Sequence, residues 1–138
     1  MNNYGIAFGD DLDFYVAIHW KVENMIENTV VEKSFDFAIR IVKLHQYLKH
    51  TKSEHVMSKQ LLRCGTSIGA NIAEAQYGQS KADFHTKMQI ALKEASETSY
   101  WLRLLNRTDY LSEKEFKSLM HDTNELLRLL TAICKSSE

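Results

Sequence analysis

The five residues from Gly65 to Gly69 match the Gly-x-Ser-x-Gly pattern that carries the nucleophilic serine of many hydrolases. That chemistry requires a strand leading into a tight turn, so that the serine hydroxyl is exposed at the top of a sheet. Here the motif lies inside a stretch whose apolar residues recur with the period of a helix, and no strand is predicted before it. We therefore expect no catalytic role for Ser67.

Metal and phosphate chemistry is not indicated by the sequence either. A di-iron bundle needs Glu-x-x-His on two helices and a further glutamate on two others, and the chain contains no Glu-x-x-His. His-Glu-x-x-His and the phosphate-binding Gly-x-x-x-x-Gly-Lys are absent as well. His45, on a predicted core face, is interpreted as a hydrogen-bonded packing residue. We expect no metal, no cofactor and no small-molecule substrate.

A polar stripe follows the same predicted helix as the serine motif, and two interpretations of it stay open. It is a solvated face, or it is a satisfied polar network at a helix seam or subunit interface. In the second case Arg63 would meet Glu94 or Glu97 of the next helix. The candidate residues for such a network are Arg63, Ser67, Asn71, Glu74, Glu94 and Glu97.

Basic side chains could contact nucleic acid, but their pattern favours a solvated surface. The formal net charge of the chain is −1, and acidic residues are interspersed with the lysines between positions 81 and 97. The candidates for a weak contact with RNA or DNA are Arg40, Lys43, Lys81 and Lys87.

The elements that would position these groups are helices, because the chain has no proline and only five glycines. The pattern predicts a helix over 35–49 with Ser34 as its N-cap. It predicts a second from after Ser53 to about 77, ended by a left-handed Gly78. Ser80 opens a third to about 107, and a capping box at Ser112 opens a fourth to about 135. Short links between four helices predict an all-α, antiparallel, up-down-up-down four-helix bundle.

The first predicted helix is apolar on more than one face. One broad face can pack into the bundle, while a second stripe consists of Phe35, Ile39 and Val42. Since a bundle covers only one side of each helix, the second stripe is a candidate oligomer interface.

Residues 1–24 do not share the helical period. Apolar and other residues alternate strictly from Leu12 to Lys21, which is typical of a half-buried strand, and residues 4–8 could supply a hairpin partner. The alternative, which we favour, is a non-native or disordered extension upstream of a natural start at Met25. The bundle domain would then cover 25–138.

Compartment is indicated by two features. No apolar run reaches the length needed to span a bilayer. Cys64 and Cys134 are isolated within predicted helices and are expected to be reduced core thiols. We expect no membrane association and a cytoplasmic protein.

The run from Leu61 to Ala75 (LLRCGTSIGANIAEA) resembles the signature of the 23S rRNA intervening-sequence proteins, usually called four helix bundle proteins. The segments 79–84 and 91–98 are similar to a second block of that family, and the likeness extends over about 30–135. The resemblance implies an antiparallel four-helix protomer that forms a homopentamer and whose biochemical role is not established. A related branch, an accessory protein of retroelements, engages nucleic acid. We expect a non-enzymatic oligomeric interaction module; the alternative is a nucleic-acid-binding accessory protein.

Overall fold

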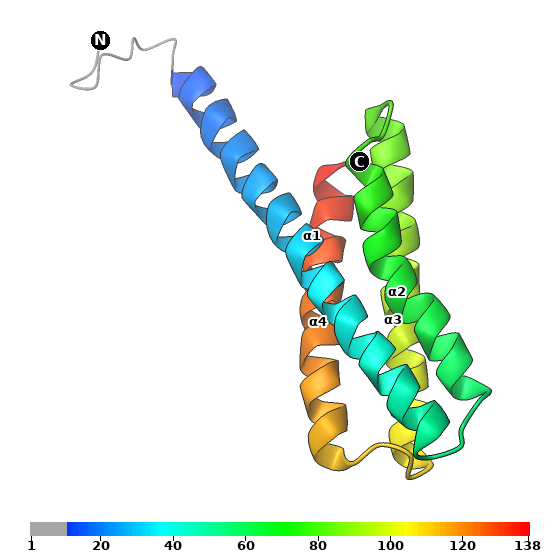
Figure 1. The fold of residues 1–138 in the computed structure, drawn as a ribbon. Coiled ribbons are helices and arrows are strands. Elements are labelled where there is room, and N and C mark those ends of the chain that lie inside the picture. Colours follow the sequence, from blue (N-terminus) through cyan, green and yellow to red (C-terminus); the bar gives the residue numbers. More distant parts are fainter. Residues whose placement is uncertain (1–10) are drawn as a thin grey trace.

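A computed structural model describes residues 11–138, and these residues form four helices joined by short loops (Figure 1). The helices are α1 (Asp11–His50), α2 (Met57–Ala75), α3 (Lys81–Arg107) and α4 (Glu113–Ser136). The all-α prediction is therefore confirmed for the part of the chain that the structure describes. None of these helices combines the length and the hydropathy required to cross a membrane.

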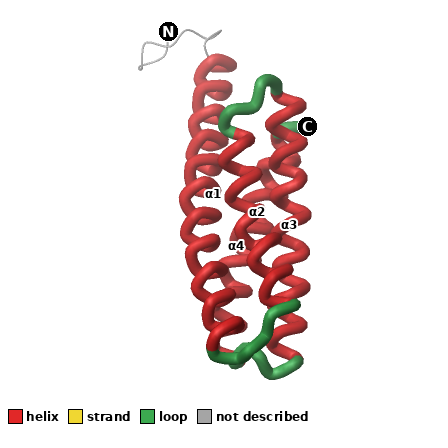
Figure 2. The backbone as a smooth tube through the Cα atoms, turned by 45° about the vertical axis from the view of Figure 1, so that its right-hand side comes forward, coloured by secondary structure: helices red, strands yellow, loops and turns green. Residues whose placement is uncertain are grey.

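The four helices run alternately up and down, with loops at opposite ends of the bundle (Figure 2). Between α1 and α2, His45 lies beside Ser58 while Ser34 lies beside Gly69, so residue numbers rise on one helix as they fall on the other. The same reversal relates α1 to α4 and α2 to α3. The contacts that show it are Lys33–Glu125, Arg40–Asp122, Glu74–Lys87 and Arg63–Glu97.

The core is formed by stripes of apolar residues that recur at helical spacing on each helix. Its largest fully buried side chains include Phe37, Ile41, Leu61, Ile68, Met88, Leu102, Leu126 and Leu130. The small residues of α2 allow α1 to approach closely, because a Cβ atom at Gly65 would lie only 2.8 Å from the Ile41 side chain. Gly65 thus leaves room for the bulky Ile41 side chain.

α1 is much longer than predicted, and the strand prediction for residues 12–21 is wrong. No glycine or proline occurs between Asp11 and His50, so nothing in the sequence interrupts a helix once it has started. Ser34, predicted as an N-cap, lies inside α1, where its hydroxyl donates to the Val31 carbonyl oxygen at 3.1 Å. The hairpin partner predicted over 4–8 lies outside the described residues.

Two predicted helix starts are confirmed. The Ser80 hydroxyl accepts a hydrogen bond from the Asp83 N–H at 3.0 Å, which caps α3. Ser112 caps α4 through the Glu115 N–H at 3.2 Å, and the Ser112 hydroxyl also contacts the Glu115 carboxylate at 3.0 Å. The bond from the Glu115 N–H to the Ser112 hydroxyl is the serine half of the predicted capping box.

The turn after α2 differs from the prediction. α2 ends at Ala75, and Gly78 does not have the left-handed conformation expected of it. The Gly78 N–H donates to the Ala75 carbonyl oxygen at 3.0 Å. A Cβ atom at Gly78 would lie 3.1 Å from that oxygen, so the glycine permits a close backbone contact instead.

Candidate functional site

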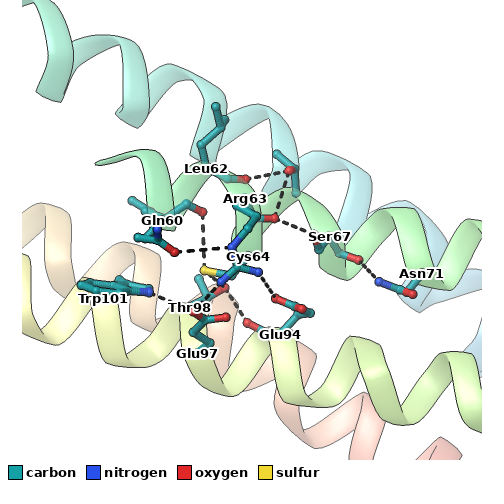
Figure 3. A network of polar contacts seen from close by, with 12 residues as sticks. Gln60, Leu62, Arg63, Cys64, Ser67, Asn71, Glu94, Glu97, Thr98 and Trp101 are labelled. Atoms are coloured by element: carbon teal, nitrogen blue, oxygen red, sulfur yellow. Dashed lines mark hydrogen bonds and ion pairs between the residues drawn. The ribbon is translucent and has the colours of Figure 1, made fainter. Parts of the chain in front are cut away.

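Arg63 stands at the centre of a charged cluster between α2 and α3 (Figure 3). Its guanidinium contacts Glu97 at 2.5 Å and Glu94 at 3.3 Å, and it also donates to the Gln60 side chain at 3.4 Å. The Trp101 indole N–H donates to the same Glu97 carboxylate at 3.3 Å. The structure thus brings together Arg63, Glu94 and Glu97, as the network interpretation predicts.

The charged side chains of this cluster neutralise one another at the protein surface. The hydrogen bond from Arg63 lowers the pKa of Glu97, and the same contact raises the pKa of Arg63. The Arg63 side chain is 49% exposed, so solvent screens these interactions. The cluster links α2 to α3, and the lowered pKa of Glu97 keeps that carboxylate ionised near neutral pH.

The other predicted members of the network do not join the cluster. Ser67 donates to the Arg63 carbonyl oxygen at 2.6 Å, and Asn71 donates to the Ser67 carbonyl oxygen at 2.8 Å. Both bonds stay within α2. Glu74 instead pairs with Lys87 of α3 at 2.9 Å, which forms a second and separate bridge.

The serine motif has no catalytic geometry. Gly65 to Gly69 lies within α2, and the Ser67 hydroxyl donates to a carbonyl oxygen of its own helix. A nucleophilic serine would instead donate to a neighbouring base.

Beneath the charged cluster lies the buried thiol of Cys64. The Thr98 hydroxyl donates to its sulfur at 3.3 Å, and burial raises the pKa of the thiol. Burial also raises the pKa of Cys134. Both cysteines are free and buried, as predicted, so neither resembles a reactive thiolate.

The outer stripe of α1, which we define as Phe35, Ile39 and Val42, faces away from the bundle. Its side chains are 67%, 42% and 39% exposed respectively. On the opposite face of the same helix, Phe37 and Ile41 are buried. The prediction that α1 carries more apolar surface than its own bundle covers is met by this arrangement.

The first part of α1, residues 11–25, projects beyond the bundle and leans away from the other helices (Figure 1). We call this segment the extension. Its described side chains are all exposed, and α1 first contributes a buried side chain at Val30. Phe14, Ile18 and Met25 are among the exposed apolar residues of the extension.

The four predicted nucleic-acid contacts do not form one surface. Arg40 is held by Asp122 at 2.5 Å and donates to the Ser118 hydroxyl at 2.9 Å. Lys87 is paired with Glu74, whereas Lys43 is exposed on α1 and Lys81 begins α3. Two of the four charges are therefore used within the protomer.

A broad groove at one end of the bundle was not singled out in the sequence. Tyr47, Lys52, Tyr100, Arg103 and Arg107 contribute to its lining, together with Asp109, Glu113 and Glu115. The basic and aromatic residues come from the end of α1, the loop that follows it and the end of α3, which are remote in the chain. Only the folded topology brings them together.

Within residues 11–138, no group of three or more His, Cys, Asp or Glu side chains is arranged to hold a metal ion. His45, the histidine on the core face, has its Nδ1 atom 3.1 Å from the Ser58 carbonyl oxygen.

The chain is similar to a known protein family and to solved structures. The family model of the 23S rRNA-intervening sequence protein matches residues 27–132. A crystal structure from Bacteroides thetaiotaomicron, of a protein with unknown function from the S23 ribosomal protein family, is similar with a TM-score of 0.79. The two chains are 53% identical, and the match covers 80% of this chain and 98% of the other. A comparison with curated proteins finds no match.

Proposed function

Because this chain belongs to the 23S rRNA-intervening sequence protein family, we propose that it is a non-enzymatic helical module that works by assembling with copies of itself. Neither the family description nor that of the Bacteroides protein names an enzymatic activity. The proposal therefore rests on the surfaces of the protomer.

The observation that carries the proposal is the exposed outer stripe of α1. Phe35 is 67% exposed, and Ile39 and Val42 follow it at helical spacing on the same face. Isolated exposed apolar residues are ordinary on proteins, but a continuous apolar face is typical of an interaction site. Burying each such side chain fully would contribute about 1.5–3 kcal/mol.

The polar groups of the described residues support a structural role. Arg63 neutralises Glu94 and Glu97, and Ser67 and Asn71 bond to their own helix. No buried side-chain polar atom in the described part of the chain lacks a hydrogen-bond partner. These groups hold helices together and are not poised for proton transfer.

We place the assembly in the cytoplasm, since both cysteines are buried free thiols of the kind that persists in a reducing compartment. Five chains is the copy number implied by the family resemblance, and we propose a ring of that size as one level of the assembly.

Light scattering coupled to gel filtration tests self-assembly. We expect the parent chain to elute as an oligomer at micromolar concentration, and Phe35→Ser with Ile39→Ser to reduce the number of chains in that oligomer. Tyr77→Ser is the matched control, because Tyr77 is 88% exposed but lies in the α2–α3 turn. A parent chain that elutes as a 16.0 kDa monomer would refute the proposal.

A nucleic-acid-binding role is the second candidate, and the groove at the end of the bundle favours it. Arginine and tyrosine side chains together can bind phosphates and stack on bases. The acidic residues Asp109, Glu113 and Glu115 in the same lining weaken the field that would attract a polyanion.

A further inference from the structure

Exposed apolar residues follow α1 over most of its length, from the extension to the outer stripe. They recur in alternating steps of four and three residues, the heptad spacing of a coiled-coil seam, with polar residues at the intervening seam positions. Exposure of the apolar members ranges from 39% to 67%. In chain order the seam reads Phe14, Ile18, Lys21, Met25, Asn28, Glu32, Phe35, Ile39 and Val42.

This seam lies opposite the face of α1 that packs into its own bundle. Val30, Phe37 and Ile41 are buried on the inner face, whereas Phe35, Ile39 and Val42 are exposed. A second helix could therefore lie along the seam without displacing α2 or α4. The spacing of the seam indicates that its partner is itself a helix with the same period.

We propose that the occupant is α1 of a second copy of this chain, packed antiparallel with its centre between residues 26 and 27. This register places Phe14 against Ile39 of the second copy and Ile18 against Phe35 of the second copy. Each contact occurs twice, because a two-fold contact is self-complementary.

The charged seam residues select this register. Lys21 of one copy lies opposite Glu32 of the other, so both charged residues of the seam face an opposite charge. A parallel in-register pair would place each of these residues against its own equivalent and bring like charges together. At the flanks Ala17 meets Ala38 of the second copy, and these small residues permit a close approach.

The pairing also explains how the extension can be stable as a helix although it projects beyond its own bundle. Residues 11–25 span about 22 Å at the rise of an α-helix. A helix of this length is marginal in water without packing partners. In the proposed register the extension of each copy covers the outer stripe of the other, so two uncovered surfaces become one interface.

This inference rests on the proposed self-assembly and adds a symmetry to it. A two-fold contact gives an even number of chains: two if it acts alone, or ten if it joins rings of five. An assembly with an odd number of chains would overturn the pairing while leaving self-assembly intact. A monomeric parent would overturn both.

Disulfide trapping tests the register. A chain carrying both Ile18→Cys and Phe35→Cys should form a covalent dimer on mild oxidation, since each new cysteine faces its counterpart in the other copy. The single variants are the controls: positions 18 and 35 are about 25 Å apart along a helix, so neither residue meets its own equivalent. Cross-linking of a single variant, or none in the double variant of an oligomeric chain, would overturn the register.

Charge reversal supplies a second measurement that does not alter the apolar seam. Lys21→Glu or Glu32→Lys alone should raise the dissociation constant of the pair about threefold to tenfold, because each change makes two contacts repulsive. The chain with both changes should recover the parent value. Sedimentation measures the constants, and circular dichroism confirms equal helix content. Failure of the double variant to recover would count against the pairing.

Discussion

Glu54, a residue of the loop between α1 and α2, determines where α2 begins. The carboxylate is buried and accepts backbone N–H bonds from Val56, Met57 and Ser58 at 3.1, 3.0 and 2.7 Å. These are donors that the first turn of a helix cannot satisfy internally. Burial acts to raise the pKa of Glu54, but the three backbone hydrogen bonds outweigh it and the pKa lies below its usual value.

Replacing Glu54 with glutamine should destabilise the fold by about 1–2 kcal/mol, since a charged acceptor is lost from a helix N-terminus. The stabilisation from the parent carboxylate is fully present above its ordinary pKa of 4.5. It is lost as the pH falls through the lower pKa of the folded state. Urea unfolding of dilute protein at several pH values measures both effects.

The control for this change is Glu113→Gln, because Glu113 is also in a first helical turn but its side chain is 64% exposed. We expect its unfolding midpoint to stay close to that of the parent. Equal midpoints for Glu54→Gln and the parent at pH 7 would show that the carboxylate does not cap α2.

The sequence could not identify this cap because serine is the commoner residue in the role. Ser53 has the better N-cap propensity, yet the structure holds it at a φ of 53°, where it reverses the chain after α1. Glu54, the next residue, caps the helix instead, because its longer side chain accepts hydrogen bonds from three N–H groups that follow it in the chain. Local propensity alone favours Ser53 as the cap, but the turn after α1 in the folded chain places Glu54 in that role.

At the scale of elements, α1 is where sequence and structure diverge most. An alternating pattern over 12–21 predicts a strand only if another strand can pair with it. Because no glycine or proline occurs between Asp11 and His50, helix propagation from the bundle continues through the segment. The result is a helix with apolar residues on several faces. Its sequence therefore matches both the alternating pattern of a strand and the period of a helix.

Deleting residues 1–24 should leave the bundle folded, because Val30 is the first buried side chain of α1 among those that the structure describes. We expect the melting temperature of the dilute, unpaired protomer to change by no more than about 2 °C, since few contacts that stabilise the bundle are removed. Circular dichroism measured over a range of protein concentrations checks this. If the truncated chain aggregates or melts much earlier even when dilute, the extension contributes to the protomer core.

At the scale of the whole molecule, the sequence predicted the four-helix architecture, the core stripes and two helix starts. Each of these depends on residues close in the chain, such as Ser112 with Glu115. One of the two interpretations of the polar stripe placed Arg63 against Glu94 or Glu97, because the two helices are consecutive and antiparallel, and the structure pairs Arg63 with both. The Arg40–Asp122 pair and the groove at the end of the bundle join distant helices, so no local pattern could reveal them.

The last prediction concerns nucleic acid. Residues 25–138 carry 16 basic and 14 acidic side chains, so each protomer offers little net attraction to phosphate. Binding to nucleic acid depends on clustered cations that release counterions, and Arg40 and Lys87 are already paired with carboxylates. We expect affinity for generic RNA or duplex DNA to be weaker than about 1 µM and to be lost by about 150 mM salt.

Fluorescence anisotropy with labelled RNA over a salt series measures this affinity. Any residual binding at low salt should fall when Arg103 and Arg107 are both changed to glutamate, since they line the groove beside Tyr47 and Tyr100. Lys81→Glu is the control, because Lys81 is exposed at the other end of α3 and outside that groove. Sub-micromolar affinity at physiological salt would mean that assembly gathers cations which are dispersed on one protomer. The nucleic-acid role would then replace the purely structural one.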